Sequence, residues 1–369
     1  MNAHLVTTLR RAAWKPLRFG ALGVLLSQAG VASAHAQWDA RPSGTTAELR
    51  GLSVVSSQVV WASGTHGTVL RTTDGGATWE VDTVADAATL DLRAIAGTSA
   101  MVAHAISIGD SSRIYRTTDG GRTWSRRWSA TKKGTFLDAI RFWDAKHGVA
   151  VSDPVDGHFL VLVTGDGGDS WREIAAERIP AALAGEGGFA ASGSCLEVGS
   201  SGNAWFGSGG AASARVYRST DGGEHWTVHD TPLRAATASA GIFSLSFRDG
   251  MHGVAVGGDY AKPSLRGRLV ALTADGGATW TATDSASGPS GYRSAVSIVP
   301  RTEGRAMVAV GLNGTDLSRD GGASWTAVDS VGYNSVLFAS PRVGWAVGPA
   351  GRVARWKGPS LARRSRPTR

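Results

Sequence analysis

The chain has 369 residues, with 38 lysines and arginines against 30 aspartates and glutamates, which gives a formal net charge of +8. Four positive charges without an acid precede residue 37, and four more fall in the last seven residues, so the body of the chain is neutral. A neutral body lacks the basic field that concentrates nucleic acid, which excludes nucleic-acid binding as its expected role. The 50 glycines, 14 tryptophans and 18% charged residues indicate a globular fold of many short elements and exclude collagen and disorder.

Residues 1–36 have the layout of a secretory signal peptide. Basic residues precede an apolar stretch from Phe19 to Val31, and small residues follow up to Ala34 and Ala36, where cleavage is expected. The apolar stretch is shorter than the ~20 residues that span a bilayer. The sequence therefore predicts export, giving a periplasmic or secreted protein.

An eight-residue pattern, (Ser/Thr)-x-Asp-Gly-Gly-x-(Thr/Ser)-Trp, recurs six times between residues 72 and 325, at steps of 45 to 55 residues, with His225 in place of Thr/Ser in the fourth copy. Strand-like segments flank each copy, so each Asp-Gly-Gly is predicted to form a hairpin turn. The carboxylate would accept hydrogen bonds from backbone N–H groups, the glycines would supply positive φ, and the tryptophan would wedge between neighbouring sheets. The residues given this structural role are Asp74, Asp119, Asp166, Asp221, Asp275 and Asp320, with Trp79, Trp124, Trp171, Trp226, Trp280 and Trp325.

A second repeated element is a short apolar strand, interpreted as an inner strand, which occurs seven times. Its copies are residues 59–63, 101–105, 148–152, 204–207, 253–257, 306–310 and 344–348. Seven strands against six turns leave one repeat incomplete, and Gln37 to Ala40 resembles the strand that follows each turn. We therefore predict an all-β fold, a single seven-bladed β-propeller of four-stranded blades in residues 37–357. The N-terminal strand would complete the last blade and close the ring.

Residues 358–369 follow the last predicted strand as a basic tail. Arg363, Arg364, Arg366 and Arg369 lie in this tail without an accompanying acid. We expect a solvated, disordered end whose charge offers peripheral attachment to an anionic membrane.

The candidate binding surface is the propeller face that carries the second-to-third and blade-to-blade loops. The longest loops are of this kind, and function usually lies in loops on a rigid scaffold. The candidate binding residues in these loops are Asp153, Glu186, Ser192, Asp259, Tyr260, Tyr292, Arg293 and Asp316. The alternative for each is a structural role, in which the side chain caps a loop by hydrogen bonding to the backbone.

The sequence predicts no catalytic, metal or cofactor set. The turn aspartates occur once per blade on the opposite face and so do not form a pair. His225 and His229 lie four residues apart without a nearby third ligand. The nucleophile elbow, the phosphate loop and the dinucleotide fingerprint are absent from the sequence.

The repeated motif resembles the Asp-box, or BNR repeat, of sialidases, sortilin-type receptors and xyloglucanases. With seven predicted blades behind a signal peptide, and with the segments at 186–192, 257–260 and 291–294, the chain is most similar to the photosystem II stability/assembly-factor-like propellers. Members of that family hold partner proteins during the assembly of membrane complexes, without catalysis. The resemblance implies a monomeric, non-catalytic scaffold that binds a protein partner at an envelope or membrane complex.

The same motif implies an alternative, a glycoside hydrolase or a glycan-binding propeller. Arg178-Ile179-Pro180 resembles the arginine motif of sialidases, but it follows the third Asp box, whereas theirs precedes the first. Xyloglucanases use a cleft between two propellers, and this chain has one. Two carboxylates roughly 5–10 Å apart across the funnel mouth would favour hydrolysis.

Overall fold

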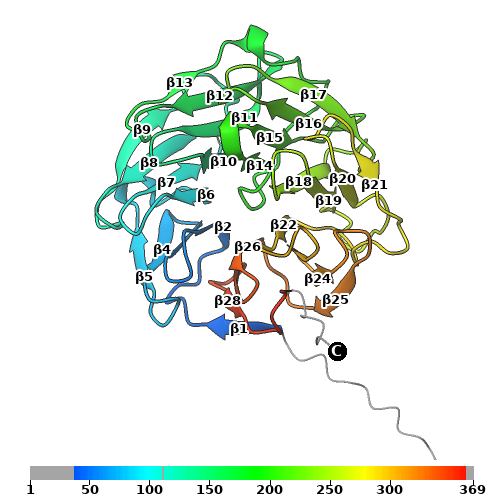
Figure 1. The fold of residues 1–369 in the computed structure, drawn as a ribbon. Coiled ribbons are helices and arrows are strands. Elements are labelled where there is room, and N and C mark those ends of the chain that lie inside the picture. Colours follow the sequence, from blue (N-terminus) through cyan, green and yellow to red (C-terminus); the bar gives the residue numbers. More distant parts are fainter. Residues whose placement is uncertain (1–36, 110–111, 363–369) are drawn as a thin grey trace, which may run out of the picture. The chain divides into compact units, whose positions relative to one another are not determined.

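The computed structural model describes residues 37–109 and 112–362, which form one ring of β-sheets (Figure 1). Within these residues, 28 strands form seven antiparallel sheets of four strands each. This arrangement confirms the predicted seven-bladed β-propeller. The predicted signal peptide at 1–36 and the four tail arginines lie outside the described residues. In the described part of the chain, no helix has the length and apolar character needed to cross a membrane.

Each blade runs from an innermost strand beside the axis to an outermost strand at the rim (Figure 1). Blades 1 to 3 consist of β2 (Leu49–Val54), β3 (Val60–Gly64), β4 (Thr68–Thr72) and β5 (Glu80–Thr83); β6 (Leu92–Gly97), β7 (Ala103–Ser107), β8 (Arg113–Thr117) and β9 (Ser125–Ser129); and β10 (Leu137–Phe142), β11 (Gly148–Val155), β12 (His158–Thr164) and β13 (Arg172–Glu173).

The remaining blades follow the same order, except that the first strand of the chain is the outermost strand of blade 7. Blades 4 to 7 consist of β14 (Leu196–Val198), β15 (Ala204–Gly207), β16 (Ala214–Ser219) and β17 (Thr227–Thr231); β18 (Ala240–Phe247), β19 (Gly253–Asp259), β20 (Val270–Thr273) and β21 (Thr281–Ala282); β22 (Ala295–Ile298), β23 (Met307–Gly311), β24 (Gly314–Ser318) and β25 (Thr326–Asp329); and β26 (Ser335–Ser340), β27 (Val343–Val347), β28 (Val353–Trp356) and β1 (Trp38–Arg41). Short 3-10 turns occur at η1 (Ala85–Ala87), η2 (Ala176–Arg178) and η3 (Ser200–Gly202).

The seven apolar segments predicted as inner strands form the second strand of each blade, next to the innermost strand. The second strand is covered by a blade on both faces, so its sequence is continuously apolar, as in Val60–Gly64. The innermost strand has one edge on the axis and accommodates polar residues such as Arg50 and Asp138.

The ring closes through β1, as the sequence predicted. Trp38 pairs in register with Trp356 of β28, and its indole Nε1 donates a hydrogen bond to Thr315 Oγ1 of blade 6 at 3.0 Å. The Trp38 ring is buried against Tyr333 and Phe338. Through Trp38, the N-terminal strand β1 therefore joins the last two blades, and its pairing with β28 removes the free sheet edge.

Neighbouring blades pack through the tryptophans and glycines of the repeated turns. Trp79 of blade 1 meets Trp345 of blade 7 edge to face, with ring centroids 5.5 Å apart. Gly76 has a φ of +82°, and a Cβ atom at this position would lie 2.1 Å from the Trp345 ring. The second glycine of this turn is therefore required by the backbone conformation and also by the close approach of the next blade.

Candidate functional site

The six Asp-box turns line one face of the propeller, and five of them hold the aspartate in the same way, whereas in blade 4 the His225 ring replaces the second hydroxyl. In blade 2, the Asp119 carboxylate accepts hydrogen bonds from the Thr117 hydroxyl at 2.9 Å, from the Thr123 hydroxyl at 2.6 Å and from the Thr123 N–H at 2.9 Å. These donors, above all the Thr123 hydroxyl, lower the pKa of Asp119 to about 2. The carboxylate is fully used in shaping its own turn, which fits the structural role predicted for this residue type.

At the other end of the axis, the innermost strands carry bulges that turn single side chains toward the centre of the ring. The strand register skips one residue in each of four blades. The skipped residues are Arg50, Arg93, Asp138 and Phe243. A bulge re-aims the side chain of the extra residue, so four blades present their own group at this end of the axis.

The axial plug, defined as residues 186–194, fills the space onto which these side chains converge (Figure 1). It belongs to the long connection between blades 3 and 4. Arg50 of blade 1 donates to the Ala191 carbonyl at 3.1 Å. The Ser192 hydroxyl donates to the Ser294 carbonyl of blade 6 at 2.9 Å.

The plug is also attached to the three blades nearest to it in sequence. The Gly188 N–H donates to Asp153 of blade 3 at 2.6 Å, Gly187 pairs with Gly209 of blade 4, and the Ser194 hydroxyl donates to Ser244 of blade 5 at 2.8 Å. With the contacts described above, one nine-residue segment joins five blades and closes the axis at this end.

An aromatic cluster covers the middle of the plug. Phe189 stacks on Phe243 with ring centroids 4.0 Å apart, and Tyr292 meets Phe243 edge to face at 4.7 Å. The ring centroid of Tyr260 lies 6.5 Å from that of Phe189, and Tyr260 keeps 49% of its surface exposed. Tyr260 is thus the residue of this cluster that offers its ring to solvent.

Two carboxylates lie directly beneath the plug. Asp138 is buried, neither of its oxygens has a hydrogen-bond partner, and a Cβ atom on Gly188 would lie 2.3 Å from its Oδ2. Burial, with a contribution from the charge of Asp153, raises the pKa of Asp138 well above its ordinary value. Burial also raises the pKa of Asp153, to about 6. The carboxylates in this pair therefore favour the protonated form, in contrast to those of the Asp boxes.

Two further acids at the plugged end are held in buried ion pairs. Glu186 pairs with Arg215, which also donates to the Tyr217 hydroxyl at 2.6 Å. Asp316 pairs with Arg293, and both side chains are buried. Each acid is neutralised by a cation within the fold, so both pairs hold loops in place.

The eight residues predicted as a binding set do converge around the plugged end, but most of them contact other parts of the fold. Six are buried: Glu186, Ser192, Asp259, Tyr292, Arg293 and Asp316. Asp153 is partly buried against the plug, and Tyr260 is exposed. A role in ligand binding stays a prediction for all eight, and the geometry favours Tyr260.

Sequence reasoning found Tyr260 but missed the other exposed apolar residues in the loops at the plugged end. Five large apolar side chains in the second-to-third and blade-to-blade loops remain exposed. They are Leu183, Tyr260, Leu265, Leu312 and Val331, and we call them the loop-face patch. Residues 260–268 of blade 5 add three exposed cations and no acid. A scan for large apolar residues inside loops would have found this patch, because surface loops seldom carry several of them.

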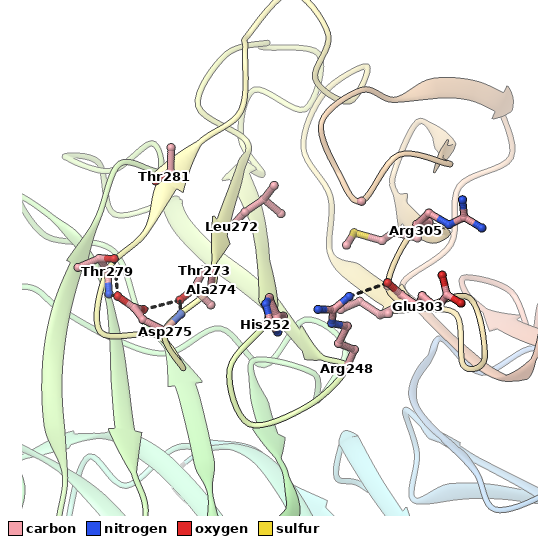
Figure 2. A pocket seen from close by; sticks show the side chains of 15 residues that line it. Arg248, His252, Leu272, Thr273, Ala274, Asp275, Thr279, Thr281, Glu303 and Arg305 are labelled. Carbon is pink, nitrogen blue, oxygen red and sulfur yellow. Dashed lines mark hydrogen bonds between the residues drawn. The ribbon is translucent and has the colours of Figure 1, made fainter.

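The Asp-box face carries two equivalent grooves between adjacent blades. The groove of about 550 Å³ between blades 5 and 6 has the apolar residues Leu272 and Met307 in its wall. Figure 2 shows Asp275 and Arg248 on opposite sides of this groove with His252 between them. A groove of about 640 Å³ between blades 3 and 4 places His147 at the corresponding position. The two histidines are each paired with a nearby aspartate of the same turn, and in the described residues no group of three potential ligands could hold a metal ion.

The comparisons with known proteins agree with this architecture. A family model described as the BNR/Asp-box repeat matches residues 115–126, which include the Asp119 turn. No curated protein matches the chain in sequence.

Several solved structures share the fold. A structure of YCF48 bound to D1 peptide is 20% identical, with 87% of this chain and 95% of that chain covered and a TM-score of 0.62. YCF48 from Cyanidioschyzon merolae is 21% identical, with 87% and 99% covered and a TM-score of 0.61. The GH74 enzyme of Niastella koreensis is 15% identical with a TM-score of 0.61, and the 86% of this chain that matches covers 53% of the enzyme. The chain therefore has the seven-bladed fold of the YCF48 structures and carries the BNR/Asp-box repeat that its sequence motif predicted.

Proposed function

We propose that this protein is an exported, non-catalytic propeller that binds a protein partner and acts as a scaffold or assembly factor for an envelope or membrane complex. The observation that carries the proposal is the loop-face patch. Five large apolar side chains stay in water on loops that surround a closed axis. Exposed apolar side chains do not stabilise the fold, and several of them on one face commonly mark a protein-binding surface.

The charge beside the patch indicates the chemistry of the partner. Lys262, Arg266 and Arg268 are exposed in the same loop as Tyr260 and Leu265, without an acid between them. We expect a partner segment that combines apolar or aromatic side chains with acidic ones. YCF48, a propeller of the same fold, has been solved with a bound D1 peptide, which supports binding of a protein segment here.

The carboxylates of the plugged end support binding in preference to glycan hydrolysis. Glu186 and Asp316 are neutralised by Arg215 and Arg293, and Asp138 is buried beneath the plug. A retaining or inverting glycosidase needs two carboxyl groups that face the substrate. Among the described residues at this end, these acids face protein groups instead.

Capture experiments with matched variants test this function. The mature protein is immobilised and exposed to solubilised envelope proteins of its own organism, beside a Tyr260→Ser/Leu265→Ser variant. The control is Met101→Ser, which removes a similarly exposed apolar side chain from the Asp-box face. We expect a partner that is retained by the wild type and by the control and is lost by the loop-face variant.

A glycan assay tests the alternative function, glycoside hydrolysis. The same preparations are incubated with xyloglucan and with a sialylated oligosaccharide, and the reducing ends or free sialic acid are measured. Turnover by the wild type, together with partner retention unaffected by the loop-face variant, would contradict the proposed function.

A further inference from the structure

Seven equivalent positions line the axis near the Asp-box face, at the end away from the plug. Each lies in an innermost strand, directly opposite the same position of the second strand. The residues are Ser53, Ala96, Arg141, Glu197, Ser246, Ser297 and Leu337. Comparing the residue at this position in all seven blades therefore shows which residue type is common and which blades differ.

The ordinary residue is a small one that connects adjacent blades. Ser53 accepts a hydrogen bond from the Gly97 N–H at 3.0 Å, and Ser246 accepts one from the Ile298 N–H at 3.1 Å. Ser297 does the same for the next blade at 3.2 Å. Arg141 and Glu197 replace this small hydroxyl in two consecutive blades, so packing between blades does not account for their charge.

Arg141 and Glu197 both line an open pocket of about 430 Å³ on the axis. The innermost strands of five blades contribute to its wall, and its partly exposed apolar residues include Val54, Val55 and Leu337. At the far end of the same strands lie the bulges that contact the plug. The pocket therefore opens on the Asp-box face and is separate from the loop-face patch.

The two charged groups in this pocket are not paired with each other. Among the described residues, neither Arg141 nor Glu197 takes part in an ion pair, and the Arg141 side chain donates a long hydrogen bond of 3.3 Å to the Ile140 carbonyl. The remaining acid in the wall, Asp144, is already paired with His147 at 2.9 Å. Burial raises the pKa of Glu197 to about 7, against the attraction of Arg141, so an added cation beside it would restore its charge.

We propose that this axial pocket binds a free apolar α-amino acid. The ligand carboxylate pairs with the Arg141 guanidinium, its ammonium group pairs with the Glu197 carboxylate, and its side chain packs against the wall formed by Val54, Val55 and Leu337. An α-amino acid carries its ammonium and carboxylate groups on the same carbon atom. These two groups complement the one anion and the one cation that neighbouring blades present in the pocket. This binding is independent of the protein-partner function proposed above, because it uses the opposite face.

The experiment is calorimetric titration of the whole mature protein with two matched sets of three probes. L-leucine is compared with 4-methylpentanoate, which lacks the ammonium group, and with 3-methylbutylamine, which lacks the carboxylate. L-phenylalanine is compared with 3-phenylpropanoate and 2-phenylethylamine in the same way. We expect each amino acid to bind roughly 10- to 100-fold more tightly than its analogues, the range expected for one charged hydrogen-bonded contact.

Two pocket variants and one control separate the roles of the two residues. Glu197→Gln should lower the affinity for the amino acids to that of the deaminated acids, and Arg141→Gln should lower it to that of the amines. Glu303→Gln, a change of an exposed acid outside this pocket on the same face, should leave every affinity unchanged. Circular dichroism spectra and melting temperatures equal to those of the wild type show that the variants are folded.

Each contrary outcome decides against the proposal. Equal affinities for L-leucine and 4-methylpentanoate would show that Glu197 does not recognise an ammonium group. An absence of heat with all six probes would show that the pocket binds no such ligand. Loss of protein-partner binding with either pocket variant would show that the two faces are not independent.

Discussion

The two faces of the propeller use aspartate in opposite ways. On the Asp-box face, Asp119 is half-buried, accepts three short hydrogen bonds and has its pKa lowered to about 2. Beneath the axial plug, Asp138 is buried, accepts no hydrogen bond and has a raised pKa, and the pKa of neighbouring Asp153 is raised to about 6. The difference shows that a local turn supplies its own donors, whereas the axis brings acids together from distant segments without enough donors for all of them.

The contrast extends to what each face does for the molecule. The turns are complete within eight residues and only have to pack against the next blade. The plugged end depends on bulges, a long insertion and loops from several blades, and it leaves the loop-face patch in water. Changes in the Asp-box turns should therefore affect stability alone, and changes at the plugged end should affect both stability and binding.

The largest expected effect is that of Gly76→Ala in the first Asp box. The new methyl group would meet the Trp345 ring while alanine is held at a φ of +82°. We expect a loss of about 2–5 kcal/mol in the free energy of unfolding, from overpacking together with the left-handed backbone. Urea titration followed by tryptophan fluorescence measures it.

Gly157→Ala is the matched control for that change. Gly157 has a φ of +85°, and a Cβ atom there meets nothing within 4 Å. We expect only the backbone cost of about 1–2 kcal/mol. An equal loss for both variants would show that contact with the next blade is not what fixes the second glycine of the box.

The next effect is that of Phe243→Ala at the plugged end. Phe243 is 2% exposed and stacks on Phe189 of the plug. We expect a loss of about 3–4 kcal/mol in the free energy of unfolding, and faster hydrogen exchange of the Gly188 amide as the plug loosens. Unchanged exchange at Gly188 would contradict the view that the aromatic cluster fixes the plug.

Because of Asp153, the stability of the protein should fall as the pH rises. Folding raises the pKa of Asp153 from 3.8 to about 6, so the folded state holds this proton more tightly than the unfolded chain does. Its contribution to the free energy of unfolding is therefore most favourable below pH 3.8, and about 3 kcal/mol of that free energy is lost as the pH rises through 6. Asp153→Asn keeps an acceptor for the Gly188 N–H and should remove this dependence in urea titrations between pH 4 and 7.

Asp119 should give the smallest effect and the opposite direction. Its pKa in the folded state is about 2, so its stabilising contribution is present above pH 3.8 and is lost as the pH falls toward 2. Asp119→Asn should lower the melting temperature slightly at pH 7 and leave it almost unchanged at pH 2. If Asp119→Asn and Asp153→Asn shift the pH profile in the same direction, the comparison between the two faces is wrong.

The sequence was a good guide wherever the information is local. The Asp-Gly-Gly-x-x-Trp pattern predicts a turn whose donors and acceptors lie within a few residues, and its recurrence predicts the number of blades. Trp38 stands out in the same way, because it resembles Trp79 at the start of an outer strand. The strand at Val60–Gly64 is recognisable from its sequence as an inner strand, because continuous apolarity reports burial on both faces of the blade.

The candidate site could be predicted only in outline. The loops that surround the plugged end were correctly placed on one face, yet Glu186 and Arg293 proved to be held by Arg215 and Asp316. These partners lie 29 and 23 residues away along the chain, and no pattern in the sequence pairs them. The exposed Leu265 and the buried Asp138 were missed because neither residue type stands out within its own segment.

The sequence by itself determined the repeat, the seven blades, the closing strand and the chemistry of each turn, because these depend on contacts between near neighbours in the chain or on simple repetition. The tertiary structure alone decided which side chains reach the axis. Bulges in the innermost strands turn Arg50 and Asp138 inward, and an insertion between blades 3 and 4 meets them there. Where seven blades converge, groups far apart in sequence share one small volume, and their burial and pairing follow from the closed ring as a whole.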